Sequence, residues 1–150
     1  MTTLPLLAGI EAGGTKFVLA VGTAPDAITD RHVIPTCQPA ETLAEASAWF
    51  AARGPIAAIG IASFGPVQLD PAAPNWGHIT NTPKPGWADC DIAGHVSRAL
   101  GVPAGFDTDV NAAALAEHRL GSGQGATSLA YVTVGTGVGG GLVLGDALVH

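Results

Sequence analysis

Charged residues are scarce in this chain. Asp, Glu, Lys and Arg together make up 12% of its 150 residues, about half the roughly 25% of an ordinary soluble domain. Apolar residues make up 47%, and the mean hydropathy is +0.36. A chain of this length builds one domain, or one and a half small ones. Its composition predicts that it also buries apolar surface against a partner chain or a further segment.

Basic residues are especially few. There are six Lys and Arg residues, scattered along a chain with a formal net charge of −6. Binding to nucleic acid requires a basic patch or stripe, and the sequence contains neither. We therefore expect no nucleic-acid partner.

Cysteines and targeting signals are also sparse. Cys37 and Cys90 are far apart and lack C-x-x-C spacing, which indicates reduced, buried thiols in a cytoplasmic protein. The N-terminus has no basic region, and Pro5 and Gly9 interrupt its apolar run, so we expect no signal peptide. Residues 126–145 carry no charge, but their six glycines favour a hairpin over a membrane-spanning helix. We expect no contact with a membrane.

The remaining pattern alternates between strand-like and helix-like segments. Such alternation predicts an α/β fold. A proline-rich loop, residues 64–87, interrupts it, and a loop this long is usually functional. Its Trp76, His78 and Trp87 either line a ligand cleft or pack the loop onto the domain. The predicted strands are 6–12, 17–21, 29–36, 56–62, 102–106, 129–134 and 141–149, and the predicted helices are 40–52, 91–100 and 109–120.

Two glycine-rich turns are candidate phosphate sites. Residues 11–16 read EAGGTK at the tip of a predicted hairpin, and residues 135–141 include five glycines. Glycines let backbone amides approach an anion closely, and the first turn adds a hydroxyl and a lysine. An ordinary hairpin turn or bulge explains either sequence when it is considered alone. Neither matches a Walker A motif or a dinucleotide-binding fingerprint.

Two carboxylates, Asp107 and Asp109, stand where a predicted strand meets a helix. Ligands of open α/β sheets bind outside the carboxyl ends of strands, and a helix N-terminus favours a carboxylate. Considered alone, this pair is typical of helix capping. Phosphoryl transfer, however, needs positioned phosphates, charge stabilisation and one acceptor for the hydroxyl proton. Two glycine turns and one carboxylate supply that set, so we predict Asp109 as the base.

These segments together resemble the ROK sugar kinases. The resemblance lies in residues 9–16 (GIEAGGTK), 107–111 (DTDVN) and 135–140 (GTGVGG). Residues 63–67 (SFGPV) and 82–87 (TPKPGW) are similar to those of bacterial ATP-dependent fructokinases. The resemblance implies an actin-like, ribonuclease-H-like ATPase fold, a mixed sheet with flanking helices followed by the start of a second similar domain. We expect the first domain to span residues 1–108 and the second to begin with residues 109–150.

The resemblance also implies roles for individual residues. Asp109 corresponds to the catalytic base, and Asp107 supports the turn beneath it. Glu11 would help to place Mg²⁺ through water, in a position where many relatives carry Asp. The residues implied in ATP binding are Gly13, Gly14, Thr15, Lys16, Thr136, Gly137, Gly139 and Gly140, and those implied in sugar binding are Gly65, Pro66, Thr108 and Asn111.

The activity that the resemblance implies is ATP-dependent phosphorylation of the 6-hydroxyl of D-fructose, with Mg²⁺, by a cytoplasmic homodimer. Three alternatives remain open: a kinase for mannose or glucose, a truncated nucleotide-binding fragment without catalysis, and a sugar-responsive repressor. A repressor would need a DNA-binding domain before residue 6, where the first strand begins. Relatives run on for about as long again, and a fructokinase zinc site falls in that half. We therefore assign no zinc ligand in this chain.

Overall fold

The computed structural model describes residues 4–135 and 137–150. These residues form two compact units that divide between Asp107 and Thr108. None of the helices in the described part is long and apolar enough to cross a membrane.

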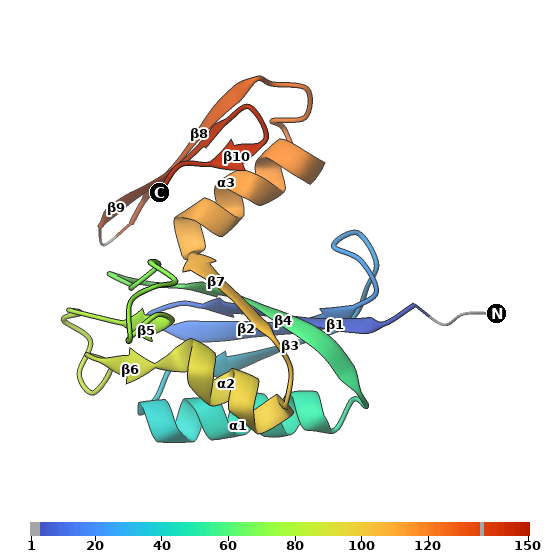
Figure 1. Cartoon of the computed structure of the whole chain (residues 1–150), viewed down its shortest axis with the longest axis vertical. Helices are drawn as coiled ribbons and strands as arrows, with labels where there is room; N and C mark the ends of the chain where they lie inside the picture. Colours follow the sequence, from blue (N-terminus) through green and yellow to red (C-terminus); the bar gives the residue numbers. More distant parts are fainter. Residues whose placement is uncertain (1–3, 136) are drawn as a thin grey trace. The chain divides into compact units, whose positions relative to one another are not determined.

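A five-stranded mixed sheet forms the centre of the first unit (Figure 1). The strand order is β3-β2-β1-β4-β7. β1 pairs antiparallel with β2 and parallel with β4. The carboxyl ends of β1 and β4 therefore meet at one edge of the sheet. The strands are β1 (Leu6–Ala12), β2 (Lys16–Gly22), β3 (Ile28–Pro35), β4 (Ile56–Ser63) and β7 (Ala104–Thr108).

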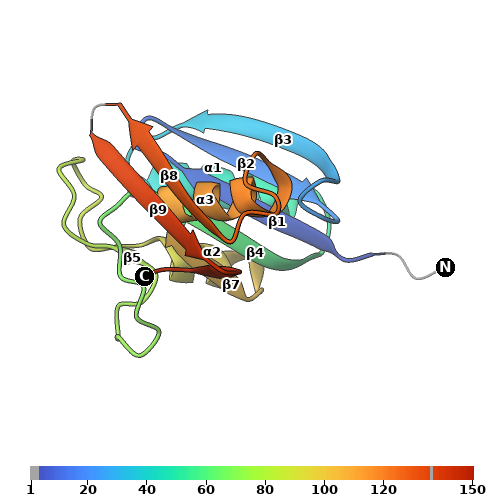
Figure 2. The same cartoon turned by 90° about the horizontal axis from the view of Figure 1, so that it is seen from above.

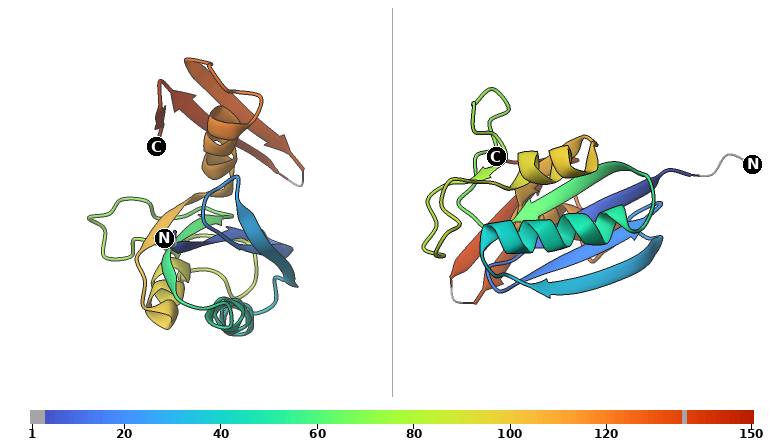
Figure 3. Two further views of the ribbon diagram at one scale, coloured as in Figure 1. Left: turned by 90° about the vertical axis from the view of Figure 1, so that its right-hand side faces the viewer. Right: turned by 90° about the horizontal axis from the view of Figure 1, so that it is seen from below.

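Helices α1 (Pro39–Ala51) and α2 (Ile92–Leu100) cover one face of this sheet (Figures 1 and 3). α1 buries residues at helical spacing, including Leu43, Ala46 and Phe50. α2 begins at Asp91, whose carboxylate caps the helix. It ends at Gly101, whose φ of 67° suits a glycine C-cap. The predicted helices at 40–52 and 91–100 thus form within one residue of their expected limits.

The long segment after β4 is fixed by its aromatic residues. Trp87 is fully buried and packs against Phe17 and Phe64, with ring centroids 5.5 Å and 5.6 Å away. Its Nε1–H donates to the carbonyl of Cys37 at 3.0 Å. Trp76 lies edge-on to Phe106. The two tryptophans therefore pack the segment onto the domain. Within the segment and just after it lie two short strands, β5 (His78–Ile79) and β6 (Cys90–Asp91).

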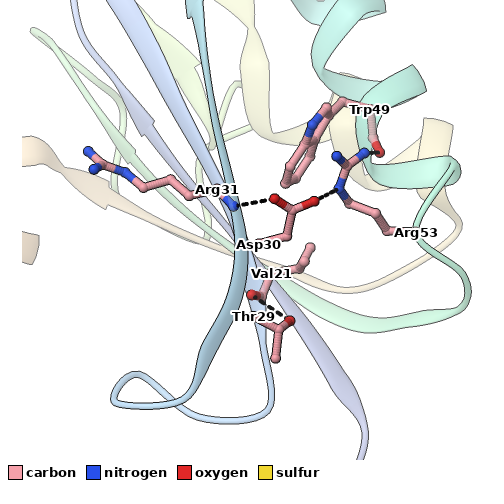
Figure 4. Close-up of polar contacts among 6 residues, drawn as sticks. All are labelled: Val21, Thr29, Asp30, Arg31, Trp49 and Arg53. Carbon is pink, nitrogen blue, oxygen red and sulfur yellow. Dashed lines mark hydrogen bonds and ion pairs between the residues drawn. The ribbon is translucent and has the colours of Figure 1, made fainter.

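Arg53 connects the end of α1 to the edge strand β3 (Figure 4). Its guanidinium lies 3.4 Å from the ring centroid of Trp49, and its Nε donates to Asp30 Oδ2 at 2.7 Å. Its Nη1 donates to the Trp49 carbonyl at 2.7 Å. One side chain thus holds the last turn of the helix against the strand.

The second unit is one helix packed on a small antiparallel sheet (Figure 2). The elements are α3 (Asp109–Leu120), β8 (Ser128–Val134), β9 (Val138–Leu144) and β10 (Ala147–Leu148). α3 contacts β8 and β9 and buries Ala114, and Val143 of β9 is also fully buried. The outer face of this sheet is exposed and consists largely of Val132, Val134, Val138, Leu142 and Leu144.

Two expectations about the last strands are wrong. The predicted strand at 141–149 is two strands, because Gly145 adopts a φ of 61° and turns the chain between β9 and β10. The second glycine-rich turn is also shorter than expected. β9 already begins at Val138, so Gly139, Gly140 and Gly141 lie in a strand that pairs with β8.

Candidate functional site

The first glycine-rich turn closes the hairpin between β1 and β2. The N–H of Gly13 donates to the carbonyl of Lys16 at 2.9 Å. A Cβ at Gly13 would lie 2.8 Å from the same oxygen, whereas none of the described atoms lies within 4 Å of a Cβ at Gly14. Gly14, Thr15 and Lys16 are exposed. Gly13 is therefore explained by the turn itself, and its three neighbours remain accessible to an anion.

Thr36 ties this turn to the end of β3, a contact that sequence reasoning missed. Its Oγ1 donates to the carbonyl of Gly13 at 2.7 Å, and its N–H donates to the carbonyl of Thr15 at 2.9 Å. The two contacts hold the tip of the hairpin from one side. Thr36 lies twenty-three positions from Gly13, and a lone Thr after a proline gives no signal of such a role.

Gly65 and Pro66 lie beside that turn, at the end of β4. The N–H of Phe64 donates to the carbonyl of Ala12 at 2.8 Å, which joins the ends of β1 and β4. The bond between Gly65 and Pro66 is cis, and both residues are exposed. The carbonyl of Pro66 accepts the N–H of Thr80 at 2.8 Å. The parallel pairing thus brings the predicted phosphate turn and the predicted sugar-contacting loop to one edge of the sheet.

Glu11 is exposed near the end of β1, opposite Val18 and Ala62 of the neighbouring strands. No group of three His, Cys, Asp or Glu residues in the described part of the chain could hold a metal ion. A single exposed carboxylate fits Mg²⁺ held mainly by water and substrate phosphates, which is how proteins commonly bind it. The described donor set gives no site for zinc.

Asp109 is the first residue of α3. Thr108 is the N-cap, and its Oγ1 accepts the N–H of Asn111 at 3.1 Å. The carboxylate of Asp109 accepts the N–H of Val110 at 2.9 Å through Oδ1. Asn111 is 7% exposed. Thr108 therefore provides the helix cap that was expected of this stretch. Capping of α3 does not explain the presence of Asp109.

The second glycine-rich run contains two kinds of glycine. Gly137 and Gly140 are exposed. A Cβ at Gly137 would meet none of the described atoms within 4 Å, and one at Gly140 would meet only the carbonyl oxygen of Tyr131, at 3.7 Å. A Cβ at Gly139 would lie 2.8 Å from Val110 Cγ1. Thr136, also predicted to bind ATP, lies outside the described residues.

The predicted site residues thus form two groups, one in each unit. Glu11, the first turn and the Gly65–Pro66 loop gather at the carboxyl ends of β1 and β4. Thr108, Asp109 and Asn111 lie in the first turn of α3, near which the glycines of β9 pack. Two pockets of the first unit, of about 270 and 250 Å³, are lined by none of these residues.

The two cysteines differ in their exposure, and Cys90 gives no sign of a reactive role. Both are free thiols. Burial, with a smaller effect from the charge of Asp91, raises the pKa of Cys90 to about 11. A thiol with such a pKa is protonated at neutral pH and is a poor nucleophile. Cys37 is exposed, so the expectation that both thiols are buried is wrong for that residue.

Sequence and structure comparisons agree on the family. The family model described as "ROK family" matches residues 7–150. A fructokinase from Pediococcus pentosaceus is 46% identical over 138 residues, 92% of this chain and 48% of that protein. A fructokinase from Zymomonas mobilis subsp. mobilis is 44% identical over 146 residues, 94% of this chain and 48% of that protein.

The fold comparison gives the same answer. A ROK family glucokinase from Streptomyces griseus, crystallised with glucose and AMPPNP, matches with a TM-score of 0.80 at 29% identity. The match covers 95% of this chain and 46% of that one. This chain spans about half the length of the curated relatives it matches. The expected mixed sheet with flanking helices is confirmed. The chain belongs to the ROK family and has the actin-like ATPase fold of its sugar kinases.

Proposed function

We propose that the protein carrying this chain is an ATP-dependent kinase that phosphorylates the 6-hydroxyl of D-fructose. The observation that carries the proposal is Asp109 at the N-terminus of α3, with its carboxylate oriented by the N–H of Val110 and helix capping supplied by Thr108. Support for the substrate comes from relatives described as fructokinases at 44–46% identity.

In this reaction Asp109 accepts the proton of the sugar hydroxyl as the hydroxyl oxygen attacks the γ-phosphorus of ATP. The bond from that phosphorus to the β–γ bridging oxygen breaks, and ADP leaves. The exposed backbone of Gly14, Gly137 and Gly140 lets amides approach phosphate oxygens, and Lys16 adds a positive charge. Mg²⁺ supplies charge neutralisation at the β- and γ-phosphates when bound, with Glu11 contributing through water. Gly65, Pro66, Thr108 and Asn111 orient the sugar.

The test is Asp109→Asn in the full-length protein. We expect turnover of fructose to fall by at least about 10²–10⁴-fold, the usual contribution of a general base, while ATP binding is largely retained. Asp107→Asn is the matched control, because it removes the neighbouring carboxylate and should retain far more turnover. Normal turnover by Asp109→Asn would show that the base is misassigned.

A second candidate is a kinase for another hexose. The glucokinase with bound glucose favours glucose as the competitor, and mannose is the other sugar to include. A pocket discriminates weakly between similar sugars unless one of them leaves a polar group unpaired. A coupled assay of the full-length protein on fructose, mannose and glucose separates these alternatives by the ratio of kcat/KM values. Intact mass of the purified protein tests whether a fragment without catalysis is present instead.

A further inference from the structure

Two glycines of β9 lie directly beneath the first turn of α3. Because side chains alternate along a strand, Gly139, Gly141 and Val143 face the helix, and Gly140 and Leu142 face away. A Cβ at Gly139 would lie 2.8 Å from Val110 Cγ1 and 3.3 Å from Thr133 Oγ1. One at Gly141 would overlap the carbonyl oxygen of Val110 and lie 2.8 Å from its carbon. Side chains at these positions would push the helix away from the strand.

The remaining glycines of the run have no such constraint. Of the described atoms, none lies within 4 Å of a Cβ at Gly135 or Gly137, and only one approaches a Cβ at Gly140, at 3.7 Å. The approach of a phosphate group can therefore explain why glycine stands at positions 135, 137 and 140, where packing would also allow a side chain. Packing against Val110 by itself explains Gly139 and Gly141.

Val110 connects this packing to the carboxylate of Asp109. Its N–H donates to Asp109 Oδ1 at 2.9 Å. Its side chain fills the space above Gly139, and its carbonyl fills the space above Gly141. A displacement of residue 110 would therefore move the hydrogen-bond donor that orients the carboxylate.

We propose that Gly139 and Gly141 are positioning residues, which set the place of the Asp109 carboxylate by letting β9 contact Val110. This inference rests on the proposed kinase function, in which Asp109 is the base. The two glycines act on the rate of proton acceptance and not on the affinity for ATP. Gly139 therefore has a role different from that of a phosphate-binding glycine.

The experiment compares Gly139→Ala, Val110→Ala and the double variant in the full-length protein. We expect Gly139→Ala to lower kcat by about 10- to 100-fold, since a displacement of about 1 Å costs as much as 10²-fold, while KM for ATP stays nearly unchanged. Val110→Ala removes the methyl that overlaps the new Cβ, so the double variant should recover most of the lost kcat. In Gly141→Ala the overlap is with backbone, so Val110→Ala should not rescue it.

Gly140→Ala is the matched control, because its side chain would point away from α3. Gly140→Ala should change kcat and KM by the same factor in the wild-type protein and in the Val110→Ala variant. A folded double variant that still lacks turnover, or a Gly139→Ala variant that mainly raises KM for ATP, would overturn the positioning role. So would a double variant that fails to fold. Turnover that survives Asp109→Asn would instead refute the proposed function, so the two failures are distinguishable.

Discussion

Asp91 combines several contacts at the start of α2. Its Oδ1 accepts the N–H of Gly94, and its Oδ2 accepts from Arg98 Nη2, both at 2.8 Å. Burial alone would raise the pKa of Asp91, but the bonds from Arg98 and Gly94, with the charges of Arg98 and His78, hold the pKa below its usual value. We expect Asp91→Ala to lower the free energy of unfolding of this chain by about 1 kcal/mol, as is typical of a lost N-cap. Urea denaturation at pH 7 measures this change.

Asp91→Asn is the control that separates capping from charge. Asn caps helices as well as Asp does, so near neutral pH this variant should keep the cap and lose only the contribution of the charge, which places its stability between those of wild type and Asp91→Ala. Because the folded pKa of Asp91 is lowered, its charge stabilises the fold above the unfolded pKa of about 3.9. That contribution is lost as the pH falls through the folded pKa. Below about pH 4 the wild type should therefore lose more stability than Asp91→Asn. Equal losses would show that the charge contributes nothing.

At the residue scale, the sequence predicts which residue types gather but not what each one touches. The spacing of EAGGTK and DTDVN led to Gly13 and Asp109, and the structure places both at the ends of strands or helices as expected. Whether a glycine is required by a ligand or by packing depends on a partner elsewhere in the chain. The Val110 contact above Gly139 is such a case, and so is the Thr36 contact that holds Gly13.

The contact between α1 and β3 gives a prediction at the scale of elements. Arg53 is stacked on Trp49 and bonded to Asp30 (Figure 4), and β3 is an edge strand with most of its residues exposed. Edge strands open more easily than central ones because one side lacks ladder bonds. We expect Arg53→Met to speed amide hydrogen exchange in β3 and in the last turn of α1, while β1 and β4 exchange as before.

Arg31→Met is the matched control for that experiment. Arg31 is the residue next to Asp30, and only its backbone N–H donates to the Asp30 carboxylate. Its side chain points away from Arg53 and Trp49 in Figure 4. Loss of this positive charge should leave exchange in the last turn of α1 unchanged. Equal acceleration by both variants would show that the general loss of charge, and not the Arg53 contact, is responsible.

The prediction of helices succeeded where the hydrophobic periodicity and the glycine or proline residues at the helix ends agreed. Gly54 and Pro55 follow α1, and Gly101 ends α2 in a left-handed conformation. It failed along residues 135–149, because glycine-rich sequence is compatible both with a turn and with a strand. There the choice is made by the pairing of β9 with β8 and by the approach of α3, which no local pattern records.

The outer face of the second sheet bears on the behaviour of the whole molecule. Val132, Val134 and Val138 are 62%, 80% and 77% exposed, and Leu142 and Leu144 continue the same apolar surface. The composition predicted apolar surface that a partner chain or a further segment would cover, and this face is uncovered apolar surface of that kind. Contiguous patches of this kind promote association.

We therefore expect the 150-residue chain, expressed by itself, to self-associate with rising concentration and to bind a hydrophobic dye. Val134→Thr combined with Val138→Thr should weaken both effects, because Thr keeps the β-branched shape that strands favour and adds a hydroxyl. Ile28→Thr with Val33→Thr replaces two exposed β-branched apolar residues on β3 of the first unit, and should leave association unchanged. Sedimentation velocity and dye fluorescence measure the two effects. A chain that stays monomeric and does not enhance dye fluorescence at any concentration would show that this face does not drive self-association by itself.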